Sequence, residues 1–224
     1  MALKIHKECL PAQGWAVLIK LLSIISTHEF VLAGGTALAI RKGHRVSYDL
    51  DFFTMKTFRN DSLISETRKK TRNFQVLSEE EGSLTLSIEG VKVSFFNYEY
   101  SFLDEILDIE GTKVAGILDI AAMKVIAINQ RGTKRDFVDL YTILQETPFH
   151  RVAAHMIRRF GRERINPVHI GKSFVYFADA DTNPDPAYRK GMELKWEDIK
   201  KFFRQHVKQF VLDLEAARKN AAAK

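Results

Sequence analysis

Two short motifs, one rich in glycine and one acidic, constrain this 224-residue chain more than any other part of its sequence. The first, Ala33–Thr36, is Ala-Gly-Gly-Thr and follows the apolar run Phe30–Ala33; the second, Asp49–Phe52, is Asp-Leu-Asp-Phe. An apolar run that ends in two glycines predicts a buried strand and then a sharp turn. The chain next predicts a helix that begins with Thr36–Arg41 and a second strand over Tyr48–Thr54. The fold must therefore accommodate two carboxylates on an otherwise apolar strand.

The two carboxylates of the acidic motif are expected on one face of that second strand. Side chains alternate along a strand, so Asp49 and Asp51 point the same way while Leu50 and Phe52 point into the core. Neighbouring carboxylates repel, and burial raises the cost unless a cation pairs with them. Magnesium commonly binds one or two carboxylates together with substrate phosphates. We predict that the pair holds a metal that carries a nucleoside triphosphate; a solvated pair on a surface strand is the structural alternative.

The glycine-rich motif suits the phosphates of the same ligand. Gly34 and Gly35 have no Cβ, so the backbone can approach a phosphate closely, and their N–H groups lie where a helix begins and its dipole favours anions. Thr36 is a plausible helix N-cap and offers a hydroxyl. Arg45 and Ser47 share the face of the acidic pair if the strand begins early. An ordinary turn before a helix is the alternative for this motif.

The rest of the chain predicts a mixed first half and a helical second half. Before residue 100 we expect a helix, then strands in a meander; after it we expect helices. The expected helices are Ala16–Ser26, Asp61–Arg72, Ile117–Asn129, Arg135–Leu144, Pro148–Phe160, Val168–Phe177 and Trp196–Ala217. The expected strands of the meander are Phe74–Leu77, Leu84–Ile88 and Val91–Phe96. We expect a loop over Asp179–Pro186 and a fraying helix or tail over Ala216–Lys224.

We therefore predict an α+β fold in two parts. Residues 1–110 would form a small mixed β-sheet core flanked by helices, and residues 111–224 a helical domain that completes the active-site cleft. The net charge of +6 and the pI near 9.3 favour an anionic partner, with a plain basic surface as the alternative.

The number of cysteines and the lengths of the apolar runs limit where in the cell the protein is expected. Cys9 is the only cysteine, which rules out an internal disulfide and a thiol zinc cluster and fits a reducing cytoplasm. The N-terminus shows no secretory signal, and apolar runs such as Leu21–Ile25 are far shorter than the roughly 20 residues of a membrane span. We expect a cytoplasmic protein without a membrane partner.

A second group of charged residues lies in the predicted helical half. Lys124, Ile128 and Arg131 share one helix face by their spacing, which puts two cations on one side, where they could meet a triphosphate. Asp136 and Asp139 are three apart on the next helix, where they could orient those cations or accept a proton from an acceptor hydroxyl. An interhelical salt-bridge network is the alternative.

Together these motifs resemble a known family. The glycine turn followed by Asp-x-Asp is similar to the signature of the polymerase-beta-type nucleotidyltransferase superfamily. Within that superfamily, the run Gly34–Ala39, then Arg45 to Phe53, resembles the AbiEii/AbiGii toxin family. Lys124 and the run Arg135–Tyr141, Arg-Asp-Phe-Val-Asp-Leu-Tyr, resemble the downstream motifs of that family.

The resemblance implies an NTP-dependent nucleotidyltransferase that moves an NMP to an acceptor, with the 3′ end of tRNA as the expected acceptor and Mg²⁺ or Mn²⁺ as the cofactor. It also implies a toxin of a toxin–antitoxin or phage-defence pair, and hence a cognate antitoxin. By this resemblance and the spacing above, the catalytic residues would be Asp49, Asp51, Lys124 and Asp136, the metal ligands Asp49 and Asp51, and the nucleotide-binding residues Gly34, Gly35, Thr36, Arg45, Ser47, Arg131 and Asp139.

One departure keeps a second hypothesis open. Many superfamily members place a third carboxylate on a later strand, and the corresponding residue here is Ser94, a poor magnesium ligand. A catalytically weak module of the same fold that binds a nucleotide or a partner is the alternative function, and a plain RNA-binding protein is a third. The arginines between Arg158 and Arg164 could grip RNA or could form a solvated helix end, while Phe174, Tyr176 and Phe177 fit core packing better than base stacking.

Overall fold

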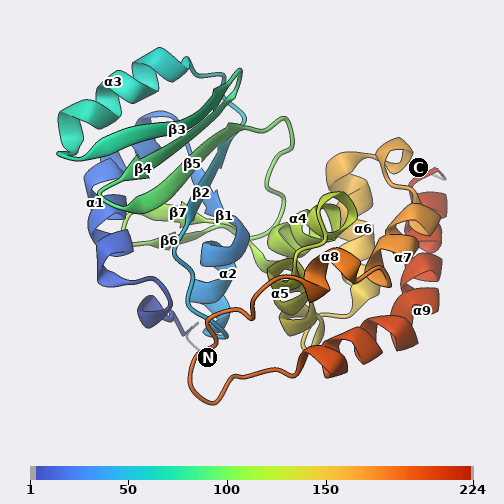
Figure 1. The fold of residues 1–224 in the computed structure, drawn as a ribbon. Coiled ribbons are helices and arrows are strands. Elements are labelled where there is room, and N and C mark those ends of the chain that lie inside the picture. The colour runs from blue at the N-terminus through green and yellow to red at the C-terminus, as the bar shows by residue number, and fades with distance from the viewer. Residues whose placement is uncertain (1–3, 223–224) are drawn as a thin grey trace. The chain divides into compact units, whose positions relative to one another are not determined.

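The structure is a computed structural model that describes residues 4–222. Contacts divide it into two compact units: unit 1 comprises residues 4–101 and 105–115, and unit 2 comprises residues 102–104 and 116–222. Unit 1 carries a seven-stranded sheet and unit 2 is helical, so the fold is α+β as predicted (Figure 1). Residue 110, where we expected the division, lies in a turn between two short strands of unit 1.

Unit 1 alternates helices with strands in its first part and ends in hairpins. Its helical segments are η1 (Lys7–Cys9), α1 (Ala12–Thr27), α2 (Gly34–Lys42) and α3 (Asn60–Lys70), and its strands are β1 (Val31–Ala33), β2 (Leu50–Thr54), β3 (Phe74–Glu80), β4 (Ser83–Ile88), β5 (Val91–Asn97), β6 (Leu107–Ile109) and β7 (Thr112–Val114).

The sheet has the strand order β3-β4-β5-β2-β1-β7-β6. The predicted meander of β3, β4 and β5 is confirmed, and it joins the rest of the sheet through the parallel pairing of β5 with β2. β2 runs antiparallel to β1, which pairs in parallel with β7. The two motifs of the sequence therefore lie on adjacent central strands.

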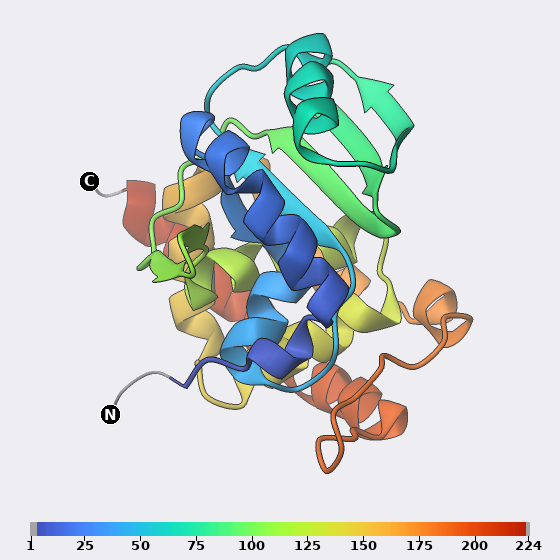
Figure 2. The same cartoon turned by 90° about the vertical axis from the view of Figure 1, so that its left-hand side faces the viewer.

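One face of this sheet forms the core of unit 1. Burial along β2 alternates, and Phe52 is fully buried on the core face as predicted. Its ring stacks on Phe95 of β5 at a centroid distance of 5.6 Å, and Phe30 contacts both rings. α1 lies across the sheet (Figure 2), contacting β2, β5 and β7. The residues of β2 between the buried ones are partly exposed on the other face.

The β6–β7 hairpin was absent from our predictions. Both strands are only three residues long, and the alternation needed to predict a strand does not develop over so short a run. β7 nevertheless pairs with β1, so its position in the sheet is set by a tertiary contact rather than by a local pattern.

Unit 2 is a packed set of helices. They are α4 (Ile117–Gln130), α5 (Lys134–Leu144), α6 (Phe149–Phe160), the short η2 (Arg162–Arg164), α7 (Pro167–Phe174), α8 (Ala178–Asp181) and α9 (Trp196–Ala222). α9 packs on α6 and α7, and α4 packs on α5, α6 and α7. The core is aromatic: Phe174 and Phe203 are fully buried, and Phe203 meets Phe137 edge to face at 5.2 Å.

Three expectations for unit 2 need correction. The helix expected over Val168–Phe177 ends at Phe174, and the loop expected from Asp179 begins inside the short helix α8. The final helix, expected to end at Ala217, continues to Ala222, so the segment expected as a fraying helix or tail is helical as far as it is described; residues 223–224 lie outside the described residues. Of the helices that the structure describes, none combines the length and the apolar character required to cross a bilayer.

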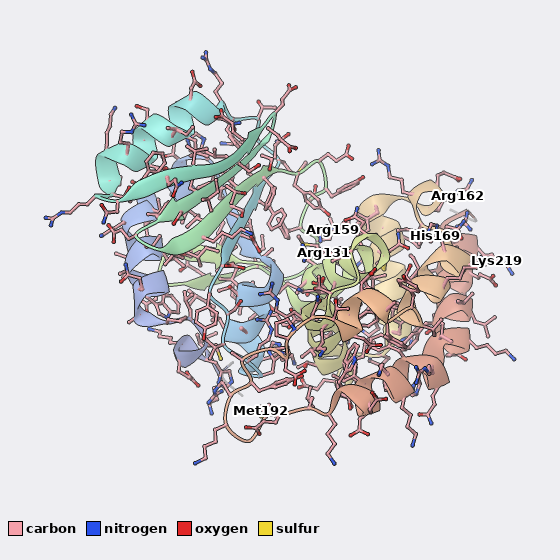
Figure 3. All side chains as sticks on the ribbon, viewed as in Figure 1. Arg131, Arg159, Arg162, His169, Met192 and Lys219 are labelled. Carbon is pink, nitrogen blue, oxygen red and sulfur yellow. The ribbon has the colours of Figure 1, made fainter. Side chains whose placement is uncertain are left out.

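A buried charged cluster holds residues 102–104, the short segment before the β6–β7 hairpin that belongs to unit 2. The Asp119 carboxylate accepts hydrogen bonds from the backbone N–H groups of Leu103 and Asp104, and it lies 2.8 Å from His155 Nε2 and 3.2 Å from Arg159 Nη1. Burial raises the pKa of Asp119, but the hydrogen bond with His155 and the other donors outweigh burial and lower it. Arg159, which we grouped with a basic surface cluster, is therefore a core residue (Figure 3).

Candidate functional site

The register of the central strands brings the glycine turn to the acidic pair. Ala33, the last residue of β1, pairs with Asp51 of β2, and α2 begins at the next residue, Gly34. Gly34 has φ +68°, a left-handed conformation that favours glycine. A Cβ added there would lie 3.2 Å from Asp51 Oδ2, so the carboxylate sits directly against the backbone at the N-terminus of α2.

A basic side chain also reaches the start of α2. A Cβ at Gly35 would collide with the Arg45 guanidinium and would lie 3.5 Å from Ser47 Oγ. Arg45 is buried, and its Nη1 donates to the carbonyl of Val46 at 3.2 Å. The helix N-terminus, the guanidinium and the serine hydroxyl are thus side by side. Such a combination attracts phosphate.

Thr36 has a different local role from the one we predicted. Ala33 occupies the N-cap position of α2, so Thr36 lies inside the helix and is not its cap. Its hydroxyl hydrogen-bonds with the Ser47 hydroxyl at 2.8 Å and donates to the backbone carbonyl of Asp49. Thr36 therefore ties the segment that precedes β2 to α2.

The two carboxylates differ in how the backbone holds them. β2 begins at Leu50, so only Asp51 lies within the paired strand, whereas Asp49 lies one residue before it and is positioned through the Thr36 hydrogen bond. Both aspartates are partly exposed, so their oxygens can meet a ligand. We predicted that Arg45 and Ser47 share the face of the acidic pair if the strand begins early; β2 begins at Leu50, two residues later than predicted, so that condition is not met.

Ser94 occupies the position next to Asp51 on the neighbouring strand. The parallel register of β2 and β5 pairs these two residues, and Ser94 is only 2% exposed. Its Oγ accepts a hydrogen bond from the Thr85 hydroxyl at 3.4 Å. Within residues 4–222, no group of three or more histidine, cysteine, aspartate or glutamate side chains is arranged to hold a metal. The carboxylates at this position are Asp49 and Asp51, both partly exposed.

An aromatic surface that our sequence reasoning missed continues from Asp51. Phe53 lies two residues further along β2, stacks on Phe96 at 5.0 Å and meets Tyr98 edge to face at 5.4 Å, and Tyr98 contacts Tyr100 at 5.1 Å. The signal was present as aromatics at every second residue from Phe96 to Tyr100. Flat, partly exposed rings beside an acidic pair can stack on a nucleobase.

The other predicted site residues form a buried cluster within unit 2. Lys124 Nζ on α4 lies 2.9 Å from Asp136 Oδ1 and 2.7 Å from Asp139 Oδ2 on α5. The Lys124 side chain is 7% exposed, and both carboxylates are buried. These contacts form an interhelical salt-bridge network, and the predicted active-site role of its members stays a prediction.

Arg131 follows the last residue of α4 and binds the same carboxylate from outside. Its Nε and Nη2 lie 2.9 and 3.2 Å from the two Asp136 oxygens, and the Thr133 hydroxyl donates to Asp136 Oδ2 at 2.7 Å. Burial raises the pKa of Asp136, but the Lys124 charge and the Arg131 hydrogen bonds outweigh burial, so the pKa lies far below its usual range. Asp136 is therefore held as the anion, and 64% of the Arg131 side chain stays exposed.

The predicted site residues thus fall into two groups. The residues of unit 1 form one continuous cluster around the start of α2; they are Gly34, Gly35, Thr36, Arg45, Ser47, Asp49 and Asp51. The residues of unit 2 form the charged network; they are Lys124, Arg131, Asp136 and Asp139.

Comparison with known proteins agrees with this geometry. Residues 20–103 and 97–220 match the family model described as "Nucleotidyl transferase AbiEii toxin, Type IV TA system". An uncharacterized protein of Aquifex aeolicus (strain VF5) is 37% identical over 195 residues, which is 86% of this chain and 93% of that protein.

Solved structures show the same fold. JHP933 from Helicobacter pylori has 17% sequence identity and a TM-score of 0.53, with 98% of each chain covered. MenT4, the nucleotidyltransferase toxin Rv2826c from Mycobacterium tuberculosis H37Rv, has 18% identity and a TM-score of 0.58, with 94% of this chain and 88% of that chain covered.

Proposed function

This chain belongs to the AbiEii family of nucleotidyltransferase toxins, and from that premise we propose that it transfers a nucleoside monophosphate from an NTP to an RNA hydroxyl. The acceptor we favour is the 3′ end of tRNA. In this reaction the hydroxyl oxygen bonds to the α-phosphorus of the NTP while the bond from that phosphorus to the bridging oxygen of the β-phosphate breaks. Pyrophosphate leaves, and the hydroxyl proton passes to solvent.

One observation carries the donor site: the register that sets Ala33 opposite Asp51. Through it, the positive end of α2, the Arg45 guanidinium beside Gly35 and the Asp51 carboxylate beside Gly34 lie next to one another. Backbone N–H groups and a cationic side chain bind the oxygens of a triphosphate, whereas carboxylates bind a metal ion. Both requirements are met within a few residues, so we assign Gly34, Gly35, Arg45 and Ser47 to the phosphates.

The carboxylate pair suits a divalent ion such as Mg²⁺ or Mn²⁺. Asp49 and Asp51 are partly exposed oxygen donors, and a nucleotide's phosphates would complete their set. Such an ion, when bound, neutralises phosphate charge and supports in-line displacement. Thr36 keeps the Asp49 backbone in place through its hydrogen bond, so it acts as a positioning residue.

The network in unit 2 is proposed to supply positive charge. Arg131 is the exposed member and would meet an anionic group, while Lys124 lies behind it between two carboxylates. A carboxylate with a depressed pKa is a weak base near neutral pH. We therefore assign Asp136 to orienting Lys124 and Arg131 rather than to deprotonating the acceptor. Asp139 supports the same lysine.

Membership of a toxin family implies an NTP substrate and a cognate antitoxin. We place the enzyme in the cytoplasm, where both NTP and tRNA are available. The second candidate is a catalytically weak module that binds a nucleotide or a partner, and the buried Ser94 beside Asp51 favours it, because a third carboxylate is missing at that position.

Label transfer distinguishes the two candidates. The full chain is incubated with α-labelled NTPs, magnesium and total RNA, and labelled RNA is resolved on a gel. We expect transfer by the wild type, loss of at least about a hundredfold for Asp49→Ala and Asp51→Asn, and wild-type transfer for Asp198→Asn, an exposed control aspartate on α9. Tight NTP binding without transfer to RNA under any metal condition would support the binding module instead.

A further inference from the structure

Unit 2 contains a pocket that the donor site does not use. Its volume is about 380 Å³, within the roughly 300–1,000 Å³ typical of small-molecule sites. It lies between the end of α4 with its following turn and the segment that runs from α7 into α8. Its lining residues are Ile128, Asn129, Gln130, Arg131, Gly132, His169, Lys172, Ser173, Tyr176 and Asp179.

The polar wall of this pocket is firmly built. The Ser173 hydroxyl donates to Asn129 Oδ1 at 2.8 Å and so ties α7 to α4. Gly171 packs so closely on α9 that a Cβ there would lie 2.5 Å from a methyl group of Val211, which fixes the opposite side of α7. Gly132 takes φ +53° in the turn after Arg131. The lining therefore rests on packed helices.

The charges of the lining favour an anion. Arg131, which follows α4, and Lys172 on α7 are exposed cations of the lining, and His169 lies three residues before Lys172 on the same helix. Asp179 is the one carboxylate of the lining, and the C-terminal end of α4 adds a partial negative charge. Because the Arg131 charge is shared with the Asp136 carboxylate, Lys172 contributes most of the positive charge that the pocket offers to an anion.

An exposed aromatic ring completes the pocket. Tyr176 is 58% exposed, whereas its neighbours Phe174 and Phe177 are buried in the aromatic core. Our sequence reasoning put all three rings in the core, and for Tyr176 this is wrong. A flat ring at the edge of a basic pocket offers a stacking surface for a nucleobase, and Asp179 offers an acceptor for a ribose hydroxyl or a base amino group.

We propose that this pocket binds a nucleotide of single-stranded acceptor RNA, with its phosphate between Arg131 and Lys172 and its base on Tyr176. This inference rests on the proposed function, because it names where the acceptor of that reaction binds. Most of the lining is exposed, which suits a strand that enters and leaves the pocket better than an enclosed mononucleotide. The phosphate site that we propose for the donor NTP lies at the start of α2, in unit 1.

RNA binding by the full chain without NTP tests the proposal. The probe is a short fluorescent single-stranded RNA, and the variants are Lys172→Glu and Tyr176→Ala, with Tyr176→Phe as the conservative partner. Lys208→Glu, an exposed lysine on α9 outside the pocket lining, is the matched control. We expect dissociation constants about tenfold higher for Lys172→Glu and Tyr176→Ala, and within about twofold of wild type for the other two.

A crosslink maps the site directly. RNA carrying 4-thiouridine is irradiated on the protein, and crosslinked peptides are identified by mass spectrometry. Peptides that contain residues 129–132 or 169–179 are the expected result. Crosslinks confined to other peptides, or unchanged RNA affinity in both Lys172→Glu and Tyr176→Ala while thermal unfolding confirms their fold, would overturn the proposal.

The same variants separate the two sources of nucleotide. In label transfer, Lys172→Glu should raise the KM for RNA about tenfold and leave the KM for NTP unchanged; a rise confined to NTP would show that the pocket serves the donor and would overturn the proposal. If Lys172→Glu weakens RNA binding but the wild-type protein never transfers label, the proposed function alone is contradicted. Transfer with an unaltered KM for RNA contradicts the pocket alone.

Discussion

At the scale of single residues, chemistry that looks alike in the sequence separates by environment. Asp51 and Asp136 are both aspartates beside cationic residues, yet the first is partly exposed against a glycine backbone and the second is buried under a lysine, an arginine and a threonine. The partly exposed Asp51 carboxylate can exchange contacts with solvent for contacts with a metal ion that carries phosphates. The buried one would lose three partners by doing so, which is why we assign it to orientation.

Gly34→Ala tests the close approach of backbone and carboxylate. An alanine at φ +68° is strained by about 1–2 kcal/mol, and its Cβ would also press on Asp51 Oδ2 at 3.2 Å. Gly191→Ala is the matched control: its φ is +81°, and the described residues leave the added Cβ with no atom within 4 Å.

We expect both variants to lose stability in urea unfolding through backbone strain, with Gly34→Ala losing at least as much as Gly191→Ala because of the added contact with Asp51. Only Gly34→Ala should raise the KM for NTP, by about tenfold or more, in steady-state label transfer. Equal kinetic effects in the two variants would mean that strain alone, and not contact with Asp51, limits the reaction.

At the scale of elements, helix pairing depends on the charged network as well as on apolar packing. α4 supplies Lys124 and α5 supplies Asp136 and Asp139, so three buried charges lie on the contact between two helices. Removing one partner from such a group leaves an uncompensated buried charge, which costs about 3–5 kcal/mol. The pairing of these helices should therefore depend on protonation.

Acid should weaken this pairing. The folded pKa of Asp136 lies below its unfolded value of about 3.9, so its contribution to stability is complete above that value and is lost as the pH falls toward the folded pKa. Between pH 6 and pH 3, the free energy of unfolding of the wild type should therefore fall by about 1 kcal/mol more than that of Asp136→Asn. Urea titrations at several pH values measure the difference.

An exposed aspartate provides the control for this titration. Asp198→Asn on α9 changes the same functional group at the surface and should keep the wild-type dependence on pH. If Asp136→Asn lost stability in acid as steeply as the wild type, the network would not be the group whose protonation matters.

At the scale of the whole molecule, the chain builds two cores and crosses between them three times. Residues 102–104 leave unit 1 and pack on unit 2, the β6–β7 hairpin returns to unit 1, and the chain enters α4 after Ala115. The Asp119 carboxylate, buried in unit 2, holds the first crossing by accepting the backbone N–H groups of Leu103 and Asp104, and His155 and Arg159 contact the same carboxylate. This cluster serves the organisation of the chain rather than its chemistry.

Asp119→Ala should loosen residues 102–104, the first crossing, while leaving the sheet of unit 1 unaffected. The Leu103 and Asp104 amides donate to the Asp119 carboxylate, so their hydrogen exchange should become at least about tenfold faster in the variant. The amide of Phe95 in β5 should keep wild-type protection, because it lies in the core of unit 1. Unchanged exchange at Leu103 would show that other contacts hold the segment.

The sequence by itself determined the local elements and the type of chemistry. Apolar periodicity predicted the main helices and the meander, because burial of one face imposes a period that a local window detects. The glycine turn and the Asp-x-Asp pair predicted a site for a phosphate and a metal, and their resemblance to the AbiEii motifs is confirmed by the family match. Strands of three residues, such as β6 and β7, were too short to show any period.

Only the tertiary structure decided which of these groups meet. Strand register placed Ala33 and Ser94 on either side of Asp51, although the three residues are far apart in the sequence. Helix packing buried Lys124 between two carboxylates and left Tyr176 exposed while its aromatic neighbours entered the core. The physical reason is that residue type limits what a side chain can do, whereas burial and partners follow from contacts between segments that no local pattern specifies.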